Sequence, residues 1–146
     1  MYRNSASTSL TGVYCNFLFN SILSKDILVC FYSVFHPTEL QSRSFDPNNN
    51  FEELIDLFEY KTFPDTFEIF YHISAATNQD RKKAFLFFQN GLAYTMTFDF
   101  ENKFSEYIDL TNDDTSGMTY DKDYSQQKLF YSKQTNEFLI GSKHYS

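Results

Sequence analysis

Residues 83–100 read KAFLFFQNGLAYTMTFDF, two apolar and aromatic runs separated by Asn90 and Gly91. Asn and Gly both tolerate positive φ, which the two central residues of the commonest hairpin turn require, so this dipeptide is a strong hairpin signal. The aromatic residues in the flanking runs, 83–89 and 92–100, are favoured in strands. The stretch therefore predicts an antiparallel hairpin, and the strands predicted elsewhere would extend its sheet.

Other segments also carry strand patterns. In residues 13–19 every second residue is apolar or cysteine, which is the period of a half-buried strand. Extending the pattern through Ile22 and Leu23 would suit a helix instead. Residues 41–50 are predicted to be a polar connection. The further predicted strands are residues 27–35, residues 67–73 and a last hairpin formed by residues 129–132 and 137–141.

Residues 51–58 carry the strongest helix pattern in the chain. Asn50 can cap such a helix while Glu53 reaches back to it, and Pro64 prevents the helix from continuing. The apolar side chains of this segment fall at the i, i+3, i+4 and i+7 spacing of one helical stripe. They are Phe51, Leu54, Ile55 and Phe58.

Six or seven candidate strands against one clear helix predict an α+β fold. We expect a mainly antiparallel, hairpin-built sheet with one or two helices covering one face. The chain has 146 residues, a length within the roughly 100–200 residues of one domain. Residues 1–146 are therefore expected to form a single globular domain, with about the first ten residues frayed.

Composition and charge narrow the class of protein. The 18 Phe and 11 Tyr exclude a disordered chain, because such chains are poor in aromatic residues. The 12 basic and 19 acidic residues give a net charge of −7. That charge opposes binding to nucleic acid, whose affinity comes mainly from Lys and Arg, and to anionic membranes. It favours a basic protein partner.

Cys15 and Cys30 both lie in apolar surroundings, where free cysteines pack as small hydrophobes. Two buried thiols are therefore expected, and a bridge is open only if neighbouring strands bring the Cα atoms within about 7 Å. The first ten residues lack the apolar run of a secretory signal, and no apolar stretch has the length that spans a bilayer. Together these features predict a cytoplasmic protein.

No residue pattern selects a catalytic, metal or cofactor site. The three His and two Cys show no metal-ligand spacing. Residues 109–117 superficially resemble a calcium loop but lack its glycine at the sixth position and, further on, its glutamate at the twelfth. The basic run Arg81, Lys82 and Lys83 is predicted to be a solvated hairpin tip. The expectation is a protein that is not an enzyme and has no cofactor and no metal.

The charge is unevenly distributed, because residues 101–124 hold seven acidic residues against two lysines, a net charge of −5. Carboxylates in such an acidic segment can steer a basic partner, and tyrosines can anchor it. The plainer alternative is a solvated acidic loop. The predicted partner-binding residues are Glu101, Glu106, Tyr107, Asp109, Asp113, Asp114, Tyr120, Asp121, Asp123 and Tyr124.

A small acidic α+β chain with an acid- and tyrosine-bearing segment and no catalytic motif resembles the immunity proteins of bacterial polymorphic-toxin systems, contact-dependent growth inhibition among them. The resemblance implies a protein that binds one cognate toxin, often a basic nuclease, and blocks its active site by mimicking the charge of nucleic acid. Two other functions stay open. One is a small-ligand-binding domain whose aromatic sheet lines a pocket, and the other is an enzyme such as a nuclease that uses His72 or His144. The sequence does not decide between a monomer and a homodimer.

Overall fold

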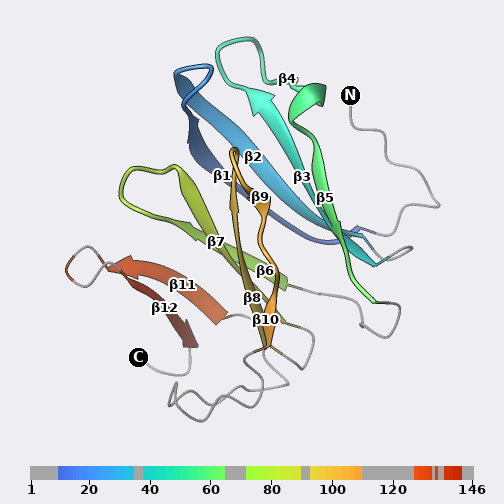
Figure 1. Ribbon diagram of the computed structural model, residues 1–146, viewed down its shortest axis with the longest axis vertical. Coiled ribbons are helices and arrows are strands. Elements are labelled where there is room, and N and C mark those ends of the chain that lie inside the picture. Colours follow the sequence, from blue (N-terminus) through green and yellow to red (C-terminus); the bar gives the residue numbers. More distant parts are fainter. Residues whose placement is uncertain are drawn as a thin grey trace.

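A computed structural model describes residues 10–34, 38–64, 72–89, 93–109, 127–132, 134 and 137–142. Within these ranges the chain is almost entirely antiparallel β structure (Figure 1). Two five-stranded sheets and a separate two-stranded hairpin contain all the described strands. The one helical element in the same ranges is the short 3₁₀ turn η1 (Ile55–Leu57).

Sheet A contains the first five strands of the chain. In space β1 to β4 follow their order in the sequence, and β5 also pairs with β3. These strands are β1 (Leu10–Asn20), β2 (Lys25–Val34), β3 (Glu39–Asp46), β4 (Glu52–Glu53) and β5 (Glu59–Thr62). Every pairing in the sheet is antiparallel, so consecutive strands are joined at alternate ends.

Sheet B contains the next five strands, in the spatial order β10, β8, β7, β6, with β9 also paired to β8. They are β6 (His72–Thr77), β7 (Lys83–Gln89), β8 (Ala93–Asp99), β9 (Lys103–Phe104) and β10 (Ile108–Asp109). The separate hairpin consists of β11 (Gln127–Ser132) and β12 (Glu137–Ser142). The hairpin predicted over residues 83–100 is confirmed, since β7 and β8 pair from Lys83 opposite Asp99 to Gln89 opposite Ala93. The last predicted hairpin is confirmed by the pairing of β11 with β12.

The two sheets pack on one shared hydrophobic core. Phe98 of β8 is fully buried, and its ring centroid lies 5.4 Å from that of Phe31 on β2 and 4.8 Å from that of Phe104 on β9. Aromatic contacts of this kind therefore join sheet A to sheet B. The buried residues of the core are Leu18, Ile27, Val29, Phe31, Leu40, Phe63, Ile73, Ala75, Ala84, Leu86, Tyr94, Met96 and Phe98.

Polar contacts connect the edges of the two sheets. β6 lies beside β1, and β9 lies beside β5. At the first edge the backbone N–H of Phe19 donates to the carbonyl of Arg81 over 2.7 Å, and the Arg81 guanidinium pairs with Asp26 at 2.7 Å. At the second edge Lys103 pairs with Glu59 at 3.3 Å. These ion pairs are partly exposed and add little stability, but they fix how the edges meet.

The predicted α+β class is wrong, because residues 51–58 form no α-helix. Asn50 and Phe51 have φ angles of 53° and 56°, outside the helical region, and β4 then pairs with β3. The apolar stripe is split, with Phe51 52% and Ile55 73% exposed, whereas Leu54 packs partly buried against the core. A helix here would need an apolar sheet face to cover, and the inner faces of the two sheets already cover each other.

The predicted polar connection over residues 41–50 is also wrong, because β3 occupies most of it. Burial alternates along β3 as expected for a half-buried strand. However, the buried positions include Ser42, Ser44 and Asp46. The strand therefore lacks the apolar alternation by which a strand is recognised in a sequence.

The two cysteines form a disulfide. Cys15 on β1 lies directly opposite Cys30 on β2, with the Cα atoms 4.0 Å apart. The expectation of two free buried thiols is therefore wrong, and the condition for a bridge, pairing of the two strands, is met. The bridge joins the two strands near the middle of the β1–β2 hairpin, at a sequence separation of 15 residues.

Candidate functional site

Two adjoining hollows lie among the connections at one end of the sheets. Their volumes are about 470 and 460 Å³. Both are lined by Asn20, the last residue of β1, and by Ile22 in the following turn. The β1–β2 turn therefore stands between the hollows, and we call the two together the end groove.

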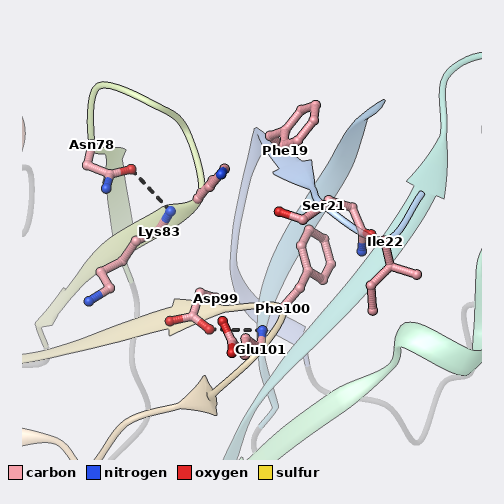
Figure 2. Close-up of a pocket in the computed structure, with 10 residues that line it drawn as sticks. Phe19, Ser21, Ile22, Asn78, Lys83, Asp99, Phe100 and Glu101 are labelled. Atoms are coloured by element: carbon pink, nitrogen blue, oxygen red, sulfur yellow. Dashed lines mark hydrogen bonds between the residues drawn. The ribbon is translucent and has the colours of Figure 1, made fainter. Parts of the chain in front are cut away.

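Three connections line the first hollow. In Figure 2 the side chains of Phe19 and Phe100 stand on one side of the space, Lys83 and Asn78 stand on the other, and Asp99 lies below them. Aromatic rings, amines and carboxylates therefore border one space. The full lining is Phe19, Asn20, Ser21, Ile22, Asn78, Lys82, Lys83, Asp99, Phe100 and Glu101.

The second hollow is lined by the β1–β2 turn and by the segment that follows β4. Three aliphatic side chains from this segment face the two aliphatic side chains of the turn. The full lining is Asn20, Ile22, Leu23, Glu53, Leu54, Ile55, Asp56 and Leu57. This hollow is the more apolar of the two, with acidic residues at positions 53 and 56.

The β1–β2 turn is held by a buried side chain. Asn20 is 2% exposed, and its Oδ1 accepts a hydrogen bond of 2.8 Å from the backbone N–H of Leu23. Ser24 closes the turn with a φ of 53°. This hydrogen bonding leaves the intervening Ile22 92% exposed at the tip. The strand pattern of residues 13–19 therefore continues to Asn20 and does not become helical.

The β6–β7 turn carries the basic run. The backbone N–H of Lys83 donates to Oδ1 of Asn78 over 3.1 Å, the bond drawn in Figure 2. Arg81 pairs with Asp26, and Nζ of Lys82 lies 5.8 Å from the ring centroid of Phe19. The run is thus at a hairpin tip, as predicted, but two of its three side chains contact sheet A.

The β8–β9 turn presents Glu101 at the rim of the first hollow. Oδ1 of Asp99 accepts hydrogen bonds from the backbone N–H groups of Glu101, at 2.9 Å, and Asn102, at 2.5 Å. Asp99 is therefore occupied in shaping the turn (Figure 2). Within the described part of the chain the exposed Glu101 carboxylate has neither a hydrogen-bond partner nor an ion-pair partner.

A partly buried ion pair ties the first residue of β2 to the last residue of β3. Nζ of Lys25 donates to Oδ2 of Asp46 over 2.6 Å, and the backbone N–H of Asn48 donates to Oδ1 over 2.9 Å. The Lys25 hydrogen bond, followed by that of Asn48, lowers the pKa of the Asp46 carboxyl below its usual value. The side chain of Asp46 is 10% exposed, and the pair holds together the ends of β2 and β3 that adjoin the β1–β2 turn and the loop before β4.

We predict that Asp46→Asn lowers the free energy of unfolding at neutral pH and that this loss disappears in acid. Because the folded-state pKa lies below the unfolded value of about 3.9, the carboxylate stabilises the fold above that pH. The contribution is lost as the pH falls through the folded-state pKa. Urea unfolding of both proteins from neutral pH down to about pH 2 measures the difference.

Asp56→Asn is the control, since Asp56 is exposed and has no partner among the described residues. The role given to the Lys25–Asp46 pair would be contradicted if Asp46→Asn lowered the free energy of unfolding equally at every pH. It would also be contradicted if Asp56→Asn changed the free energy of unfolding with pH in the same way as Asp46→Asn.

The described part of the predicted acidic segment does not form one cluster. Glu101 lies at the end groove, whereas Asp109 pairs on β10 opposite Tyr94. Tyr94 and Asp99 are five residues apart on β8, or about 17 Å. Glu106 is 85% exposed in its side chain and pairs with Lys61 at 2.9 Å. Asp113, Asp114, Tyr120, Asp121, Asp123 and Tyr124 lie outside the described residues.

Tyr107 is a packing residue in this fold. It is half-buried against the core, with its ring centroid 5.4 Å from that of Phe63 and 5.8 Å from that of Tyr94. Sequence reasoning treated it as a partner-binding anchor, and that role stays a prediction.

The exposed aliphatic residues of the end groove were missed by sequence reasoning. Ile22 and Leu23 break the alternation of residues 13–19 and come just before the predicted turn at residues 24–26, which is the signal that the sequence offers. Ile55 was assigned to the buried stripe of a helix. An apolar residue that falls outside the alternation of a strand is therefore the sequence feature that could indicate the end groove.

Sites of other kinds are not found in the described ranges. No group of three or more His, Cys, Asp or Glu side chains there is placed to hold a metal ion. No described helix has the length and apolar character needed to cross a membrane. His144 and the side chain of His72 lie outside what the structure describes, so the suggested nuclease residues stay a prediction.

Comparisons with family models, curated proteins and solved structures find no match to this chain.

Proposed function

We propose that the protein is a binding protein rather than an enzyme, and that it neutralises a basic protein partner such as a nuclease toxin, in the manner of the immunity proteins that it resembles in size and charge. In this proposal neither nucleic acid nor a membrane is a ligand, and no cofactor takes part. The partner approaches the end groove, where Glu101 is the first residue of the acidic segment 101–124.

The observation that carries the proposal is the exposed Glu101 carboxylate at the rim of the first hollow, which has no partner among the residues that the structure describes. An unpaired carboxylate at an interface rim steers an oppositely charged partner and accelerates its association. Glu101 is also the first residue of the segment with a net charge of −5, on a chain whose net charge is −7. Both the local and the overall charge favour a basic protein.

A small ligand is the second candidate, because the first hollow has a suitable size and lining. Its volume of about 470 Å³ falls within the roughly 300–1,000 Å³ of small-molecule sites. Phe19 and Phe100 offer apolar contact, while Lys83 and Glu101 offer charges of both signs. This candidate would be favoured if a metabolite raised the melting temperature of the protein and no basic protein partner were captured.

The first test is to capture the tagged protein with its partner from source cells at low and at moderate salt, and to identify the captured protein by mass spectrometry. We expect one stoichiometric basic protein that is released as salt rises, because screening weakens charge attraction. Capture of no basic protein would contradict the proposal.

We predict that Glu101→Lys slows association with the purified partner by about two- to tenfold at low salt, because rim charges act mainly on the on-rate. The matched control is Glu39→Lys, which changes the net charge by the same amount as Glu101→Lys. Glu39 is the first residue of β3, seven residues or about 23 Å from Asp46 at the other end of that strand. Joint reversal of Asp113, Asp114, Asp121 and Asp123 tests the rest of the segment. Unchanged on-rate and salt dependence in both acidic-segment variants would contradict the charge-steering role.

The cytoplasmic location expected from the sequence stays a prediction. The Cys15–Cys30 disulfide weighs against it, since persistent disulfides are rare in cytosolic proteins. The disulfide is more consistent with an oxidising compartment than with the cytoplasm. The protein could also neutralise a toxin in such a compartment.

A further inference from the structure

We infer that the second hollow of the end groove anchors an apolar side chain of the partner, and that Lys or Arg residues flank that side chain. This inference rests on the proposed function. It places the main contact on the aliphatic residues around the β1–β2 turn rather than on the acidic segment.

The first support is the exposure of the aliphatic residues at this hollow. Ile22 is 92% exposed, Ile55 73% and Leu23 44%, and all three line the same hollow. Isolated exposed apolar residues are ordinary on protein surfaces, but a contiguous group around a hollow marks an interaction site. Leu54 and Leu57 extend the apolar lining.

The second support is the rigid backbone that presents these side chains. The backbone N–H of Leu54 donates to the carbonyl of Ser44 over 2.7 Å, and that of Leu57 donates to the carbonyl of Leu54 over 3.0 Å. Asn20 holds the opposite wall through Leu23. A hollow fixed in this way loses little conformational entropy when a partner binds.

Backbone strain next to the hollow points the same way. Asn50 and Phe51 are consecutive residues with positive φ, and Phe51 is 52% exposed. Positive φ is unfavourable for a bulky residue such as phenylalanine, and strain of this kind is concentrated at functional sites. The loop that leads into β4 therefore holds an unfavourable conformation without burying its aromatic side chain.

Charge identifies the partner's chemistry. Three acidic residues, Glu52, Glu53 and Asp56, lie within residues 51–57, and the sequence has no Lys or Arg between Arg43 and Lys61. Glu53 pairs with Arg43 at 3.8 Å, so the negative charge left at the hollow comes from Asp56 in its lining and from the exposed Glu52 beside it, neither of which has an ion-pair partner among the described residues. Asp56 has no partner within the described ranges. Interfaces commonly combine an apolar anchor in a pocket with a polar rim. A carboxylate rim suits a segment that carries Lys or Arg beside its apolar residue and disfavours an acidic one.

The test with the captured partner uses the double variant Ile22→Ser, Ile55→Ser. Both side chains are largely exposed, so the fold should tolerate the change. We expect affinity to fall by about tenfold or more through faster dissociation, because loss of an anchor costs at least about 1.4 kcal/mol. Val13→Ser is the control, since Val13 is 51% exposed on β1 but does not line the groove. It should leave affinity unchanged.

A second test needs no natural partner. The probe is the peptide acetyl-Arg-Leu-Arg-amide, titrated to millimolar concentration into ¹⁵N-labelled protein. We expect saturable shifts of the amide signals of residues 22–23 and 54–57. The peptides acetyl-Arg-Ser-Arg-amide and acetyl-Glu-Leu-Glu-amide, which lack the apolar residue or reverse the charges, should shift these signals much less.

The outcomes separate the inference from the proposed function. A partner that binds the double isoleucine variant within twofold of wild type, or equal shifts with all three peptides, would overturn the apolar anchor while leaving neutralisation of a basic partner intact. Selective peptide shifts without any captured basic protein would support the anchor site and overturn the proposed function.

Discussion

Phe98→Ala should lower the free energy of unfolding by about 3–5 kcal/mol, the range for deletion of a buried phenylalanine side chain. Phe98 is fully buried and its ring packs against Phe31 of the opposite sheet as well as Phe104 of its own. Its removal therefore leaves a cavity between the two sheets. Urea unfolding followed by circular dichroism gives the midpoint and slope from which the loss is calculated.

Phe17→Ala is the matched control, because Phe17 is 40% exposed on β1. We expect it to cost far less than the core substitution. If Phe98→Ala does not fold, Phe98→Leu keeps most of the volume and should remain measurable. Equal losses for Phe98→Ala and Phe17→Ala would show that the sheets do not share the core described above.

Loss of the Cys15–Cys30 disulfide should cost about 3 kcal/mol. The bridge spans 15 residues of sequence. Cross-linking a loop of about this length lowers the conformational entropy of the unfolded chain, which raises the free energy of unfolding by about 3 kcal/mol. The double variant Cys15→Ser, Cys30→Ser should therefore melt at a lower temperature than the oxidised wild type. Calorimetry of both proteins, with and without dithiothreitol, measures the difference.

The reductant serves as its own control. It should bring the wild type to the melting temperature of the serine variant and leave that variant unchanged. Alkylation under non-reducing conditions, followed by mass spectrometry, reports whether the thiols are bonded. Free thiols in protein purified without reductant, or a wild-type melting temperature that ignores dithiothreitol, would contradict the bridge.

The parts of the fold that the sequence predicts well are those in which local turn chemistry and apolar alternation agree. The β7–β8 hairpin has Asn90 and Gly91 between two aromatic runs, and it pairs as expected. Residues 51–58 satisfy the helical spacing and capping rules but form β4 and η1, because β4 pairs with β3 and the inner faces of the two sheets already cover each other. Tertiary packing overrode the local pattern there.

The disulfide and β3 were beyond prediction for different reasons. The bridge depends on β1 and β2 pairing in the register that sets Cys15 opposite Cys30, and a shift of one residue would place the two side chains on opposite faces. The buried row of β3 contains Ser42, Ser44 and Asp46, so its apolar period is missing. Neither property can be read from residue types alone.

The candidate site was predicted only through its charge. Counting acidic residues picks out Glu101 because charge is a property of composition. The aliphatic wall of the end groove depends on three-dimensional proximity, since Ile22 and Ile55 are brought to one hollow by separate loops. The helical spacing of residues 51–58 predicts a buried Ile55, whereas Ile55 is 73% exposed.

The division of the strands between the sheets has a consequence for how the chain folds. Sheet A takes the first five strands and sheet B the next five, so strand pairing is largely between near neighbours in the sequence. Such pairings close short loops and form quickly, whereas the ion pair of Arg81 with Asp26 joins residues 55 positions apart. Each sheet is therefore expected to assemble before the two dock. Until they dock, Phe31 and Phe98 remain uncovered on separate sheets, and it is in this interval that aggregation competes with folding.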